Sequence, residues 1–433
     1  MHIKKVLIIT YYWPPSGGAG VQRWLKFVKY LPEFNIHPYV LSVDPQYASF
    51  PVLDESLEKE VPESVQVFKT KSREPFSFYK KITGESEIPY AGFVNQGNPG
   101  LLNKIARVIR GNLFIPDARV GWNKFALKKA IEIIQKYEID TLITTSPPHS
   151  TQLIGLKLKN KTGVNWIADL RDPWTDIYYY KQMYHTIWAK KLDEKYETKV
   201  LETADFTIVV SKSIKKLFEN KFPHINKNKI HVIPNGYDEP DFNFDLKSSK
   251  EEFIITHIGT LSNSQDIDSF LSAFKQLSKN NPSTSFLLRF VGNVSSLHQS
   301  RIKKLGLTRI TKYYSHVSHH ESIKFMMGSS ILLLSLAKIE GNKGILSGKL
   351  FEYLAVQRPI LGIGPPDGDA SDIIKECNAG KMFDYVDMAG ILNFLNPKLS
   401  KWKKDPSQVE KGNANFQKYA RKNLTMQLAK ILE

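Results

Sequence analysis

Short runs of β-branched and aliphatic residues alternate with segments of helical periodicity along most of this chain. A strand that is followed by a helix returns to pair in parallel with its predecessor, so the alternation favours a doubly wound parallel sheet. In the first half, the helical pattern is clearest at 21–31, 123–136, 187–201 and 214–220. The expected strands are 6–10, 38–43, 141–144, 166–170, 207–210 and 231–233.

The pattern breaks once and then restarts. A polar, acidic stretch follows 235–238 and extends to 252, after which 253–258 has the pattern of a new strand. Later strands are expected at 286–291, 310–314, 331–336 and 360–363, with helices at 300–305, 321–327 and 349–355. The expected fold class is therefore α/β, with two Rossmann-like, doubly wound parallel-sheet domains that face each other across a cleft.

These breaks predict the domain organisation. We expect an N-terminal domain at 1–245, with an irregular insert at about 49–120, and a C-terminal domain at 246–405. The remaining segment, 406–433, includes a lysine-rich helical pattern at 409–432 and is expected to pack back on the N-terminal domain. The apolar side of that helix is predicted to carry Phe416, Tyr419, Leu424, Leu428 and Ile431.

Composition narrows the class of protein. With 42% hydrophobic and 24% charged residues, the 433-residue chain is typical of globular proteins and unlike disordered or collagen-like ones. No apolar run approaches the roughly 20 residues that a membrane-spanning helix needs. The single cysteine, Cys377, excludes an internal disulfide and suits a reducing cytoplasm. The net charge of +17 favours anionic lipid, phosphorylated substrates or nucleic acid as partners, and a merely solvated lysine-rich surface is the alternative.

Polar residues follow the predicted strands of the N-terminal half, where ligands of parallel α/β sheets bind. The loop after the first strand holds Gly17 and Gly18 and leads into a helix, so its backbone can approach a ligand closely, although a plain turn is the alternative. His149 follows a second strand and is a candidate general acid or base, or a donor to a sugar hydroxyl. Its alternative role is to cap the next helix.

A cluster of charges leaves a third strand end. Asp169, Arg171 and Asp172 lie within four residues, and such charges avoid burial unless they are paired. We expect Asp172 and His149 beside the reacting group, with Asp169 orienting Arg171. A purely structural ion pair between Asp169 and Arg171 is the alternative.

The second domain repeats the pattern with glycines at two strand ends, Gly259-Thr260 and Gly292-Asn293. A small-residue loop at 344–348 then opens a helix beside Lys349, which suits a diphosphate. One turn later, Glu352 is placed to accept hydrogen bonds from a vicinal ribose diol. The alternative for Lys349 and Glu352 is an ordinary surface pair on one helix.

Taken together, these residues resemble the retaining glycosyltransferases of GT-B fold in family four, which includes lipopolysaccharide, capsule and exopolysaccharide transferases. The resemblance covers nearly the whole chain in order, and the block at 349–355 is its most specific part. The other motifs that carry it are 14–18, 146–148, 169–174, 233–236, 259–261 and 358–359.

The resemblance implies a hexosyl-type transfer with retention from a nucleotide-diphosphate sugar, with no cofactor and no required metal. The donor is expected in the C-terminal domain, and Glu352 matches the glutamate that binds the ribose. Two departures are visible: the family's other glutamate falls at Gly344, where Glu340 or Asn342 would substitute, and the basic pair expected after Gly259 is missing. The donor-binding residues implied are Gly17, Gly18, Gly259, Thr260, Gly292, Asn293, Val317, Ser347, Lys349, Leu350 and Glu352.

The acceptor side is inferred from charge. A helix at 101–110 has the pattern of a basic amphipathic helix, which is typical of attachment to an anionic membrane, although an ordinary domain helix is the alternative. The acceptor is then a polyprenyl-diphosphate-linked or lipid A-linked oligosaccharide or another glycan, at the inner face of the cytoplasmic membrane. The residues expected on this acceptor and membrane face are Arg107, Arg110, Trp122 and Arg171.

Other functions remain open at this point. A sugar-nucleotide 2-epimerase of the same fold needs the same donor pocket but no acceptor surface. A catalytically degenerate protein that binds sugar nucleotide or glycan is favoured by the missing glutamate at Gly344. Nucleic-acid binding ranks last and is not expected, because no module interleaves stacking aromatics with Lys or Arg.

Overall fold

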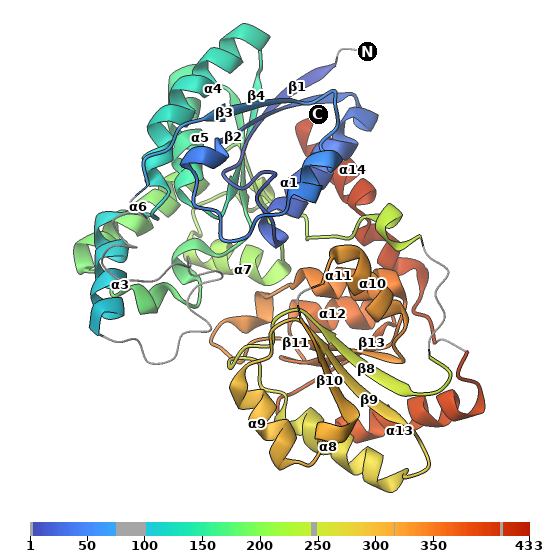
Figure 1. Cartoon of the computed structure of the whole chain (residues 1–433). Helices are drawn as coiled ribbons and strands as arrows, with labels where there is room; N and C mark the ends of the chain where they lie inside the picture. Colours follow the sequence, from blue (N-terminus) through green and yellow to red (C-terminus); the bar gives the residue numbers. More distant parts are fainter. Residues whose placement is uncertain (1–2, 75–100, 244–248, 316, 408–409) are drawn as a thin grey trace. The chain divides into compact units, whose positions relative to one another are not determined.

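The computed structural model describes residues 3–74, 101–243, 249–315, 317–407 and 410–433 (Figure 1). The chain forms two compact units. The first consists of Met1–Pro234 together with Arg421–Glu433, and the second of Asn235–Ala420. The boundary between the units therefore lies at Pro234, earlier in the chain than the expected position at 245.

The first unit contains a seven-stranded sheet in the order β3-β2-β1-β4-β5-β6-β7, and every pairing among its described strands is parallel. This order places β1 and β4 side by side, with the chain winding outward in both directions from that point, as in doubly wound folds. The strands are β1 (Lys4–Ile9), β2 (Ile36–Val43), β3 (Gln66–Thr70), β4 (Thr141–Ser146), β5 (Asn165–Leu170), β6 (Phe206–Val209) and β7 (Ile230–Val232). The helices are α1 (Ala19–Tyr30), α3 (Leu101–Leu113), α4 (Asn123–Tyr137), α5 (Ser150–Thr162), α6 (Ile187–Thr203), α7 (Lys212–Lys221) and α14 (Arg421–Leu432).

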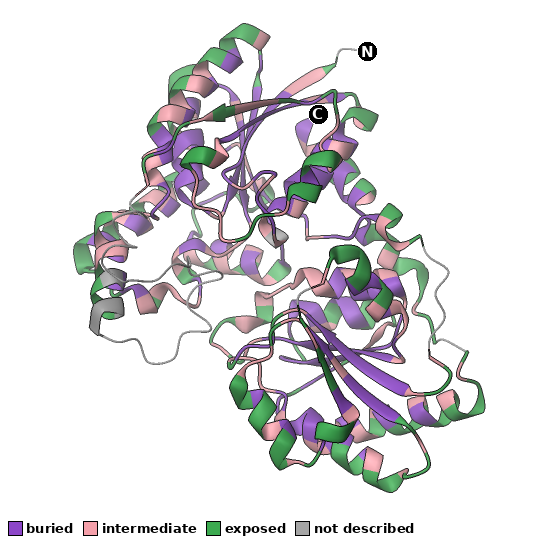
Figure 2. Ribbon diagram, in the orientation of Figure 1, coloured by how far each residue is buried: buried purple, intermediate pink, exposed green. Residues whose placement is uncertain are grey.

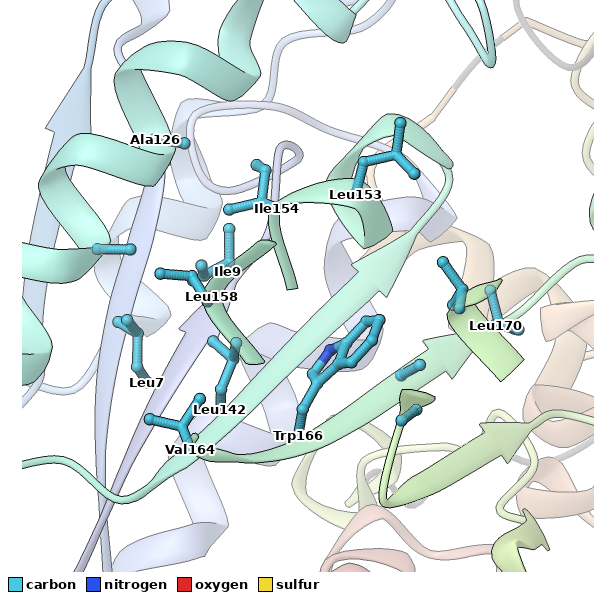
Figure 3. Packing of buried hydrophobic residues seen from close by; sticks show 14 of the residues in the cluster. Leu7, Ile9, Ala126, Leu142, Leu153, Ile154, Leu158, Val164, Trp166 and Leu170 are labelled. Atoms are coloured by element: carbon cyan, nitrogen blue, oxygen red, sulfur yellow. The ribbon is translucent and has the colours of Figure 1, made fainter. Parts of the chain in front are cut away.

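Aliphatic side chains from the strands of this sheet pack against α4 and α5 (Figure 3). Trp166 on β5 is fully buried there, and its indole N–H donates to Thr144 Oγ1 over 2.8 Å. A Cβ atom on Gly155 would lie only 2.3 Å from the indole nitrogen. Glycine is therefore what lets α5 approach this part of the sheet.

The second unit has a six-stranded sheet in the order β10-β9-β8-β11-β12-β13, again parallel at every described pairing. The order matches that of the first six strands in the first sheet, which has β7 in addition, and this confirms the predicted pair of Rossmann-like domains. Its strands are β8 (Phe253–Ile258), β9 (Phe286–Val291), β10 (Thr311–Tyr314), β11 (Ile331–Ser335), β12 (Ile360–Ile363) and β13 (Gly380–Phe383). Its helices are α8 (Asp268–Asn280), α9 (Ser296–Lys304), α10 (His319–Met327), α11 (Gly348–Val356), α12 (Asp369–Glu376) and α13 (Met388–Lys404).

Two strands are absent from the sequence-based prediction, β3 and β13. Both are edge strands, and both are short. In β3, Gln66 and Lys69 are exposed and no residue is fully buried, so the strand lacks the apolar run that marks the central strands. The segment around β3 was predicted to be an irregular insert.

The predicted single helix at 409–432 is wrong. A short 3₁₀ helix, η11 (Ala414–Tyr419), ends at Ala420, whose extended backbone (φ −61°, ψ 138°) separates it from α14. Phe416 and Tyr419 pack in the second unit, whereas Leu424 and Leu428 pack against α1 and its neighbours in the first. The apolar residues expected on one helix are thus divided between the cores of the two units.

Buried and exposed residues follow the layers in each unit, with buried strands between helices that expose their outer faces (Figure 2). In the described part of the chain, no helix is both long and apolar enough to cross a membrane.

Candidate active site

Each sheet has one point at which its winding direction reverses, between β1 and β4 in the first unit and between β8 and β11 in the second. Ligands of doubly wound sheets bind beyond the carboxyl ends of the strands at this point, where loops lead into helix N-termini. The predicted strand-end residues fall beside these two points, and each unit is described separately below.

In the second unit, two glycines and Lys349 are stacked in space. A Cβ atom on Gly292 would lie 2.8 Å from the backbone carbon of Gly259, and a Cβ on Gly259 would lie 2.6 Å from Lys349 Cε. Both glycines also have positive φ, +118° and +86°. Their amides already donate within the sheet, to the carbonyls of Tyr314 and Val291. The two glycines therefore make room for the lysine side chain rather than offering their own N–H groups to a ligand.

Lys349 lies in the first turn of α11 and is half-buried. Its Nζ approaches the carbonyl of Thr260 at 3.5 Å, and desolvation lowers its pKa to about 8 against the opposing effect of Glu352. The N-cap residue, Ser347, makes no side-chain cap. The first N–H groups of α11 and the Lys349 ammonium thus provide positive charge together, which suits a diphosphate.

Tyr353 fixes the position of α11 on the sheet. Its hydroxyl accepts from the amide of Ile258 at 3.0 Å and donates to the carbonyl of Leu333 at 3.4 Å, and its ring is fully buried. Leu350 is also fully buried, so it holds the helix in place and does not face a ligand. The helix that carries Lys349 and Glu352 is therefore anchored directly to the central strands β8 and β11.

Glu352 has a partner that sequence analysis missed. Nε2 of His319, at the start of α10, lies 3.2 Å from Glu352 Oε1, and Nδ1 lies 4.0 Å from an oxygen of Asp241. The imidazole thus stands between two carboxylates. A ribose diol bound to Glu352 would share that carboxylate with His319. Because His319 and Asp241 are far from Glu352 in the sequence, no local spacing could reveal the cluster.

Asn342, a predicted substitute for the missing glutamate, and Gln265, which lies near the place of the missing basic pair, both have other partners. The Asn342 amide donates to the carbonyl of Ala337 and the hydroxyl of Tyr385. Gln265 donates to the Ser335 carbonyl and accepts from the Ser262 amide, so it links the loops after β8 and β11. Thr260 and Asn293 are exposed just beyond strands β8 and β9, and Val317 packs against the core beside β11 and α11.

In the first unit, His149 directly precedes α5 and is 8% exposed. Neither ring nitrogen has a hydrogen-bond partner, and the ring stacks on Trp174 with the centroids 4.8 Å apart. Burial lowers its pKa to about 4, with Asp117 opposing and Arg171 reinforcing the shift. His149 is therefore neutral at pH 7. It does not cap α5, because Asp117 accepts from both the amide and the hydroxyl of Ser150.

Asp172 is half-buried, and its desolvation raises the carboxyl pKa against the attraction of Arg171. Tyr178 and Tyr179 lie within its electrostatic reach, because Asp172 adds to the burial that raises the pKa of each phenol. The charges that act on His149 come instead from Asp117 and Arg171.

The expected pairing of Asp169 with Arg171 is wrong. Asp169 is fully buried and accepts from Arg23 at 3.0 and 3.3 Å, from Trp24 Nε1 at 2.7 Å and from Thr145 Oγ1 at 2.7 Å. Arg171 donates to the backbone carbonyls of Ser146, Gly20 and Pro147 instead. The local spacing of the two residues misled the prediction, since β5 directs Asp169 toward α1. Asp169 therefore holds α1, β4 and β5 together.

Gly17 and Gly18 also have structural roles. The Gly17 amide donates to the Val52 carbonyl at 2.9 Å, and a Cβ atom at Gly17 would lie 3.1 Å from Asp54 Cβ. Gly18 has a φ of +84° and forms the N-cap of α1. The loop is thus shaped by contact with 52–54 as well as by the turn into the helix.

The residues expected on a membrane face are not exposed there. Trp122 is fully buried and donates to Thr70 Oγ1 at 2.8 Å. Arg107 is only 6% exposed, and burial lowers the pKa of Arg110. Arg107 and Arg110 of α3 therefore face the protein while Lys104 is exposed, so the basic residues do not form the outward face that was predicted.

A buried acidic network behind Trp174 was not predicted. The Trp174 indole N–H donates to Asp193 at 2.8 Å, and Glu197, one turn later on α6, accepts from Thr175 and Lys221. The buried stripe of α6 consists of Ala189, Asp193, Glu197 and Leu201, with Val200 beside them. Their i, i+4 spacing is the signal that the sequence offered, because it places two carboxylates on the inward face of the helix.

This network predicts a stability that depends on pH. Desolvation raises the pKa of Asp193 to about 7, well above the value of about 4 in an unfolded chain. The folded protein therefore holds a proton between pH 4 and pH 7 that the unfolded chain releases, so stability falls as pH rises through this window. In Asp193→Asn, the free energy of unfolding should fall by about 3–4 kcal/mol less across this window, and the hydrogen bond from Trp174 should be kept. Thermal unfolding from pH 4.5 to 8 measures it, with Glu194→Gln as the control on the same helix. An unchanged pH slope in Asp193→Asn would contradict the assignment.

Among the described residues, no three His, Cys, Asp or Glu side chains gather in a way that would hold a metal ion.

Residues 91–239 match the model of Glycosyltransferase Family 4. None of the curated protein sequences matches this chain. Solved structures match it over almost their whole length. Sucrose-phosphate synthase from Thermosynechococcus elongatus aligns over 99% of this chain and 98% of its own, with a TM-score of 0.62 and 12% identity. WaaG, a glycosyltransferase involved in lipopolysaccharide biosynthesis, aligns over 98% and 99%, with a TM-score of 0.55 and 12% identity.

A third neighbour was solved with ligands. A variant of TarM from S. aureus, in complex with fondaparinux, alpha-GlcNAc-glycerol and UDP, aligns over 99% of this chain and 100% of its own, with a TM-score of 0.56 and 13% identity. The fold is GT-B. These neighbours show the fold, and the match to Glycosyltransferase Family 4 over residues 91–239 supports a glycosyltransferase. Within this GT-B chain, the family match covers His149, Asp169 and Asp172, whereas Lys349 and Glu352 lie outside it.

Proposed function

We propose that this chain transfers a hexosyl group, with retention, from a nucleotide-diphosphate sugar to a glycan or lipid-linked oligosaccharide in cell-surface polysaccharide synthesis. The observation that carries the donor assignment is the cluster at the reversal point of the second sheet. Lys349 rests on Gly259 and Gly292, the N-terminus of α11 is not capped by a side chain, and Glu352 follows one turn later. A TarM variant that shares the fold was solved with UDP, which supports the same ligand class.

The chemistry requires the diphosphate to leave with its charge stabilised. In this proposal Lys349 and the first N–H groups of α11 bind the diphosphate, and Glu352 binds the ribose. No metal and no cofactor take part. In the first unit, Asp172 and His149 contact the acceptor, and the neutral imidazole of His149 accepts or donates one hydrogen bond to a sugar hydroxyl.

Glu352→Gln tests the donor site. If Glu352 accepts from the ribose diol, the wild type should bind a ribonucleoside diphosphate roughly 10-fold or more tightly than its 2′-deoxy analogue, because hydrogen bonds to charged groups contribute about 1.5–3 kcal/mol. The variant should bind both about equally. Isothermal titration with and without EDTA measures the affinities and any dependence on metal.

The matched control is Glu251→Gln, an exposed glutamate of the same unit. It should keep the wild-type preference for ribose. A variant Glu352→Gln that still discriminates against the deoxy analogue would place the ribose elsewhere. A loss of affinity only after EDTA treatment would contradict the metal-independent part of the proposal.

A second candidate is a degenerate protein that binds sugar nucleotide without transferring it. This candidate is favoured by Gly344, which stands where the family has a glutamate. It is also favoured by the Asn342 amide, which already donates to the Ala337 carbonyl and the Tyr385 hydroxyl. Product analysis separates the candidates. Sugar transfer to a glycan acceptor supports the transferase, conversion of the donor alone supports a 2-epimerase, and donor binding without turnover supports the degenerate protein.

A further inference from the structure

His319 lies between two carboxylates of the second unit that are far apart in the sequence. Its Nε2 is 3.2 Å from Glu352 Oε1, and its Nδ1 is 4.0 Å from Asp241 Oδ2. The first distance is that of a hydrogen bond, and the second is that of an ion pair. We call Asp241, His319 and Glu352 the imidazole bridge. Its three members come from three elements, the 3₁₀ helix η8 (Glu239–Phe242), α10 and α11.

The backbone that carries His319 is well fixed. His319 is the first residue of α10, and Ser318 and Glu321 form a capping box at this end of the helix. The Ser322 hydroxyl donates to the His319 carbonyl at 2.7 Å. These bonds stabilise the first turn of α10, so the imidazole extends from a defined position.

The three elements also share one core. α10 and α11 lie side by side (Figure 1), and Ile323 of α10 is buried in the same cluster as Leu350 and Leu354 of α11. Tyr237, just before η8, is buried in this cluster as well, and its ring meets that of Phe242 edge to face. The distances within the imidazole bridge are therefore set by a common core and not by three independent surface side chains.

A glutamate that binds a ribose diol has to be held in one conformation. Ordering a flexible side chain such as that of Glu352 costs binding free energy, unless a neighbour has already oriented it. Because an ionised carboxylate can only accept, the His319 ring donates from Nε2 to Glu352 Oε1. A carboxylate has about four acceptor positions, so this bond leaves room for the ribose hydroxyls. His319 thus orients the carboxylate without filling it.

Asp241 acts on the other side of the ring. Carboxylates at both nitrogens are satisfied together only by the protonated ring, which donates from Nδ1 as well as from Nε2. The charge of Asp241 therefore stabilises the form of His319 that makes the stronger, charge-assisted hydrogen bond to Glu352.

We propose that His319 is a positioning residue of the donor site: its imidazole orients Glu352 toward the ribose of the nucleotide, and Asp241 orients the imidazole. The inference rests on the proposed function, since it needs Glu352 to bind the ribose. A positioning residue of this kind changes the preference for ribose over deoxyribose. A residue that only supports the fold changes the affinity for both nucleotides together.

Titration calorimetry of the full-length protein tests the proposal, with the tightest-binding of UDP, GDP, ADP and CDP and with its 2′-deoxy analogue. His319→Ala should lower the preference for the ribonucleotide roughly 3- to 10-fold, because an unoriented carboxylate binds the diol less well. Its affinity for the deoxy analogue should stay close to that of the wild type. His319→Gln should restore most of the preference, because its side-chain amide donates to Glu352 in place of Nε2. His320→Ala, at the next and also exposed position of α10, is the matched control.

Asp241→Asn tests the outer part of the imidazole bridge. It should lower the preference for ribose about two- to threefold in the wild type and leave it unchanged in His319→Ala, because Asp241 acts only through the ring. An equal effect of Asp241→Asn in both backgrounds would remove Asp241 from the bridge. Unchanged melting temperatures show that the variants are folded.

The outcomes separate this inference from the proposed function. If Glu352→Gln loses the preference for ribose but His319→Ala keeps it, the donor site stands and this inference is overturned. A stronger preference in His319→Ala would mean that the imidazole competes with the ribose, and equal losses for both nucleotides would make His319 structural, so either result overturns it too. If Glu352→Gln keeps the preference, or if none of the four nucleotides binds, the proposed function is lost and this inference with it.

Discussion

Replacement of Lys349 by methionine should weaken the binding of a nucleoside diphosphate roughly 10- to 100-fold, because it removes a charge-assisted contact of about 1.5–3 kcal/mol. Methionine keeps much of the length of the side chain that rests on Gly259 and Gly292. The loss should therefore come from the missing ammonium and not from a collapse of the loop. Titration calorimetry measures the affinity, and Lys338→Met, an exposed lysine paired with Asp266 in the same unit, is the control.

The same variant has a pH signature. Desolvation lowers the pKa of Lys349 to about 8, below the usual value of about 10.4, so the ligand-free protein carries an unfavourable buried charge below pH 8. That penalty disappears as the pH rises from 8 to 10.4. Lys349→Met should therefore melt no lower than the wild type at pH 7. The wild type should also lose diphosphate affinity above pH 8, because the free lysine must then take up a proton to bind. If Lys349→Met binds the nucleoside diphosphate within twofold of the wild-type affinity, Lys349 is not part of the donor site.

Substitution of Asp169 by alanine should reduce the free energy of unfolding by about 3–5 kcal/mol, because it leaves the Arg23 guanidinium buried without its carboxylate. Both side chains are fully buried in an ion pair of 3.0 Å. The donors of Trp24 and Thr145 would lose the same acceptor. Urea denaturation followed by circular dichroism measures the change.

A double-mutant cycle separates a structural role of Asp169 from a catalytic one. Replacing a buried pair by apolar residues is often close to neutral, so Arg23→Met with Asp169→Leu should recover most of the stability lost in Asp169→Ala. Restored stability together with restored activity would show that Asp169 acts only by holding α1, β4 and β5. Restored stability without restored activity would show that Asp169 also acts at the reacting sugar. A loss below about 1 kcal/mol in Asp169→Ala would contradict the structural assignment.

The features that could be predicted from the sequence are those that depend on patterns of neighbouring residues. Central strands such as β8 and β11 are buried along their whole length and consist mostly of apolar residues, so their apolar runs are clear in the sequence. Glycines and charged residues directly after such strands fall at the carboxyl edge of the sheet for topological reasons. That Lys349 and Glu352 lie close together could be predicted because one short helix holds both, while their binding of a donor stays a prediction.

The features that sequence analysis missed depend on residues distant in the sequence or on how a helix is turned. Asp169 lies two residues from Arg171 but pairs with Arg23 of α1, because Asp169 is still part of β5 whereas Arg171 lies beyond the end of the strand and donates to backbone carbonyls. His319 meets Glu352 only after α10 packs beside α11. For α3, the hydrophobic pattern identified an amphipathic helix, but hydrophobicity alone could not show that Arg107 is buried while Ile105 and Val108 are exposed.

The return of α14 to the first unit has a consequence for how the protein is made. Residues 235–420 form the second unit without interruption, whereas the first unit needs both 1–234 and 421–433. Leu424, Leu428 and Leu432 complete the core beneath α1. During synthesis the second unit can therefore fold as soon as it has emerged, while the first must wait with an uncovered apolar face on α1 until α14 arrives. A fragment that ends before Arg421 would expose that face permanently and should aggregate. A variant in which a short linker joins Pro234 directly to Arg421 contains both parts of the first unit and should not aggregate.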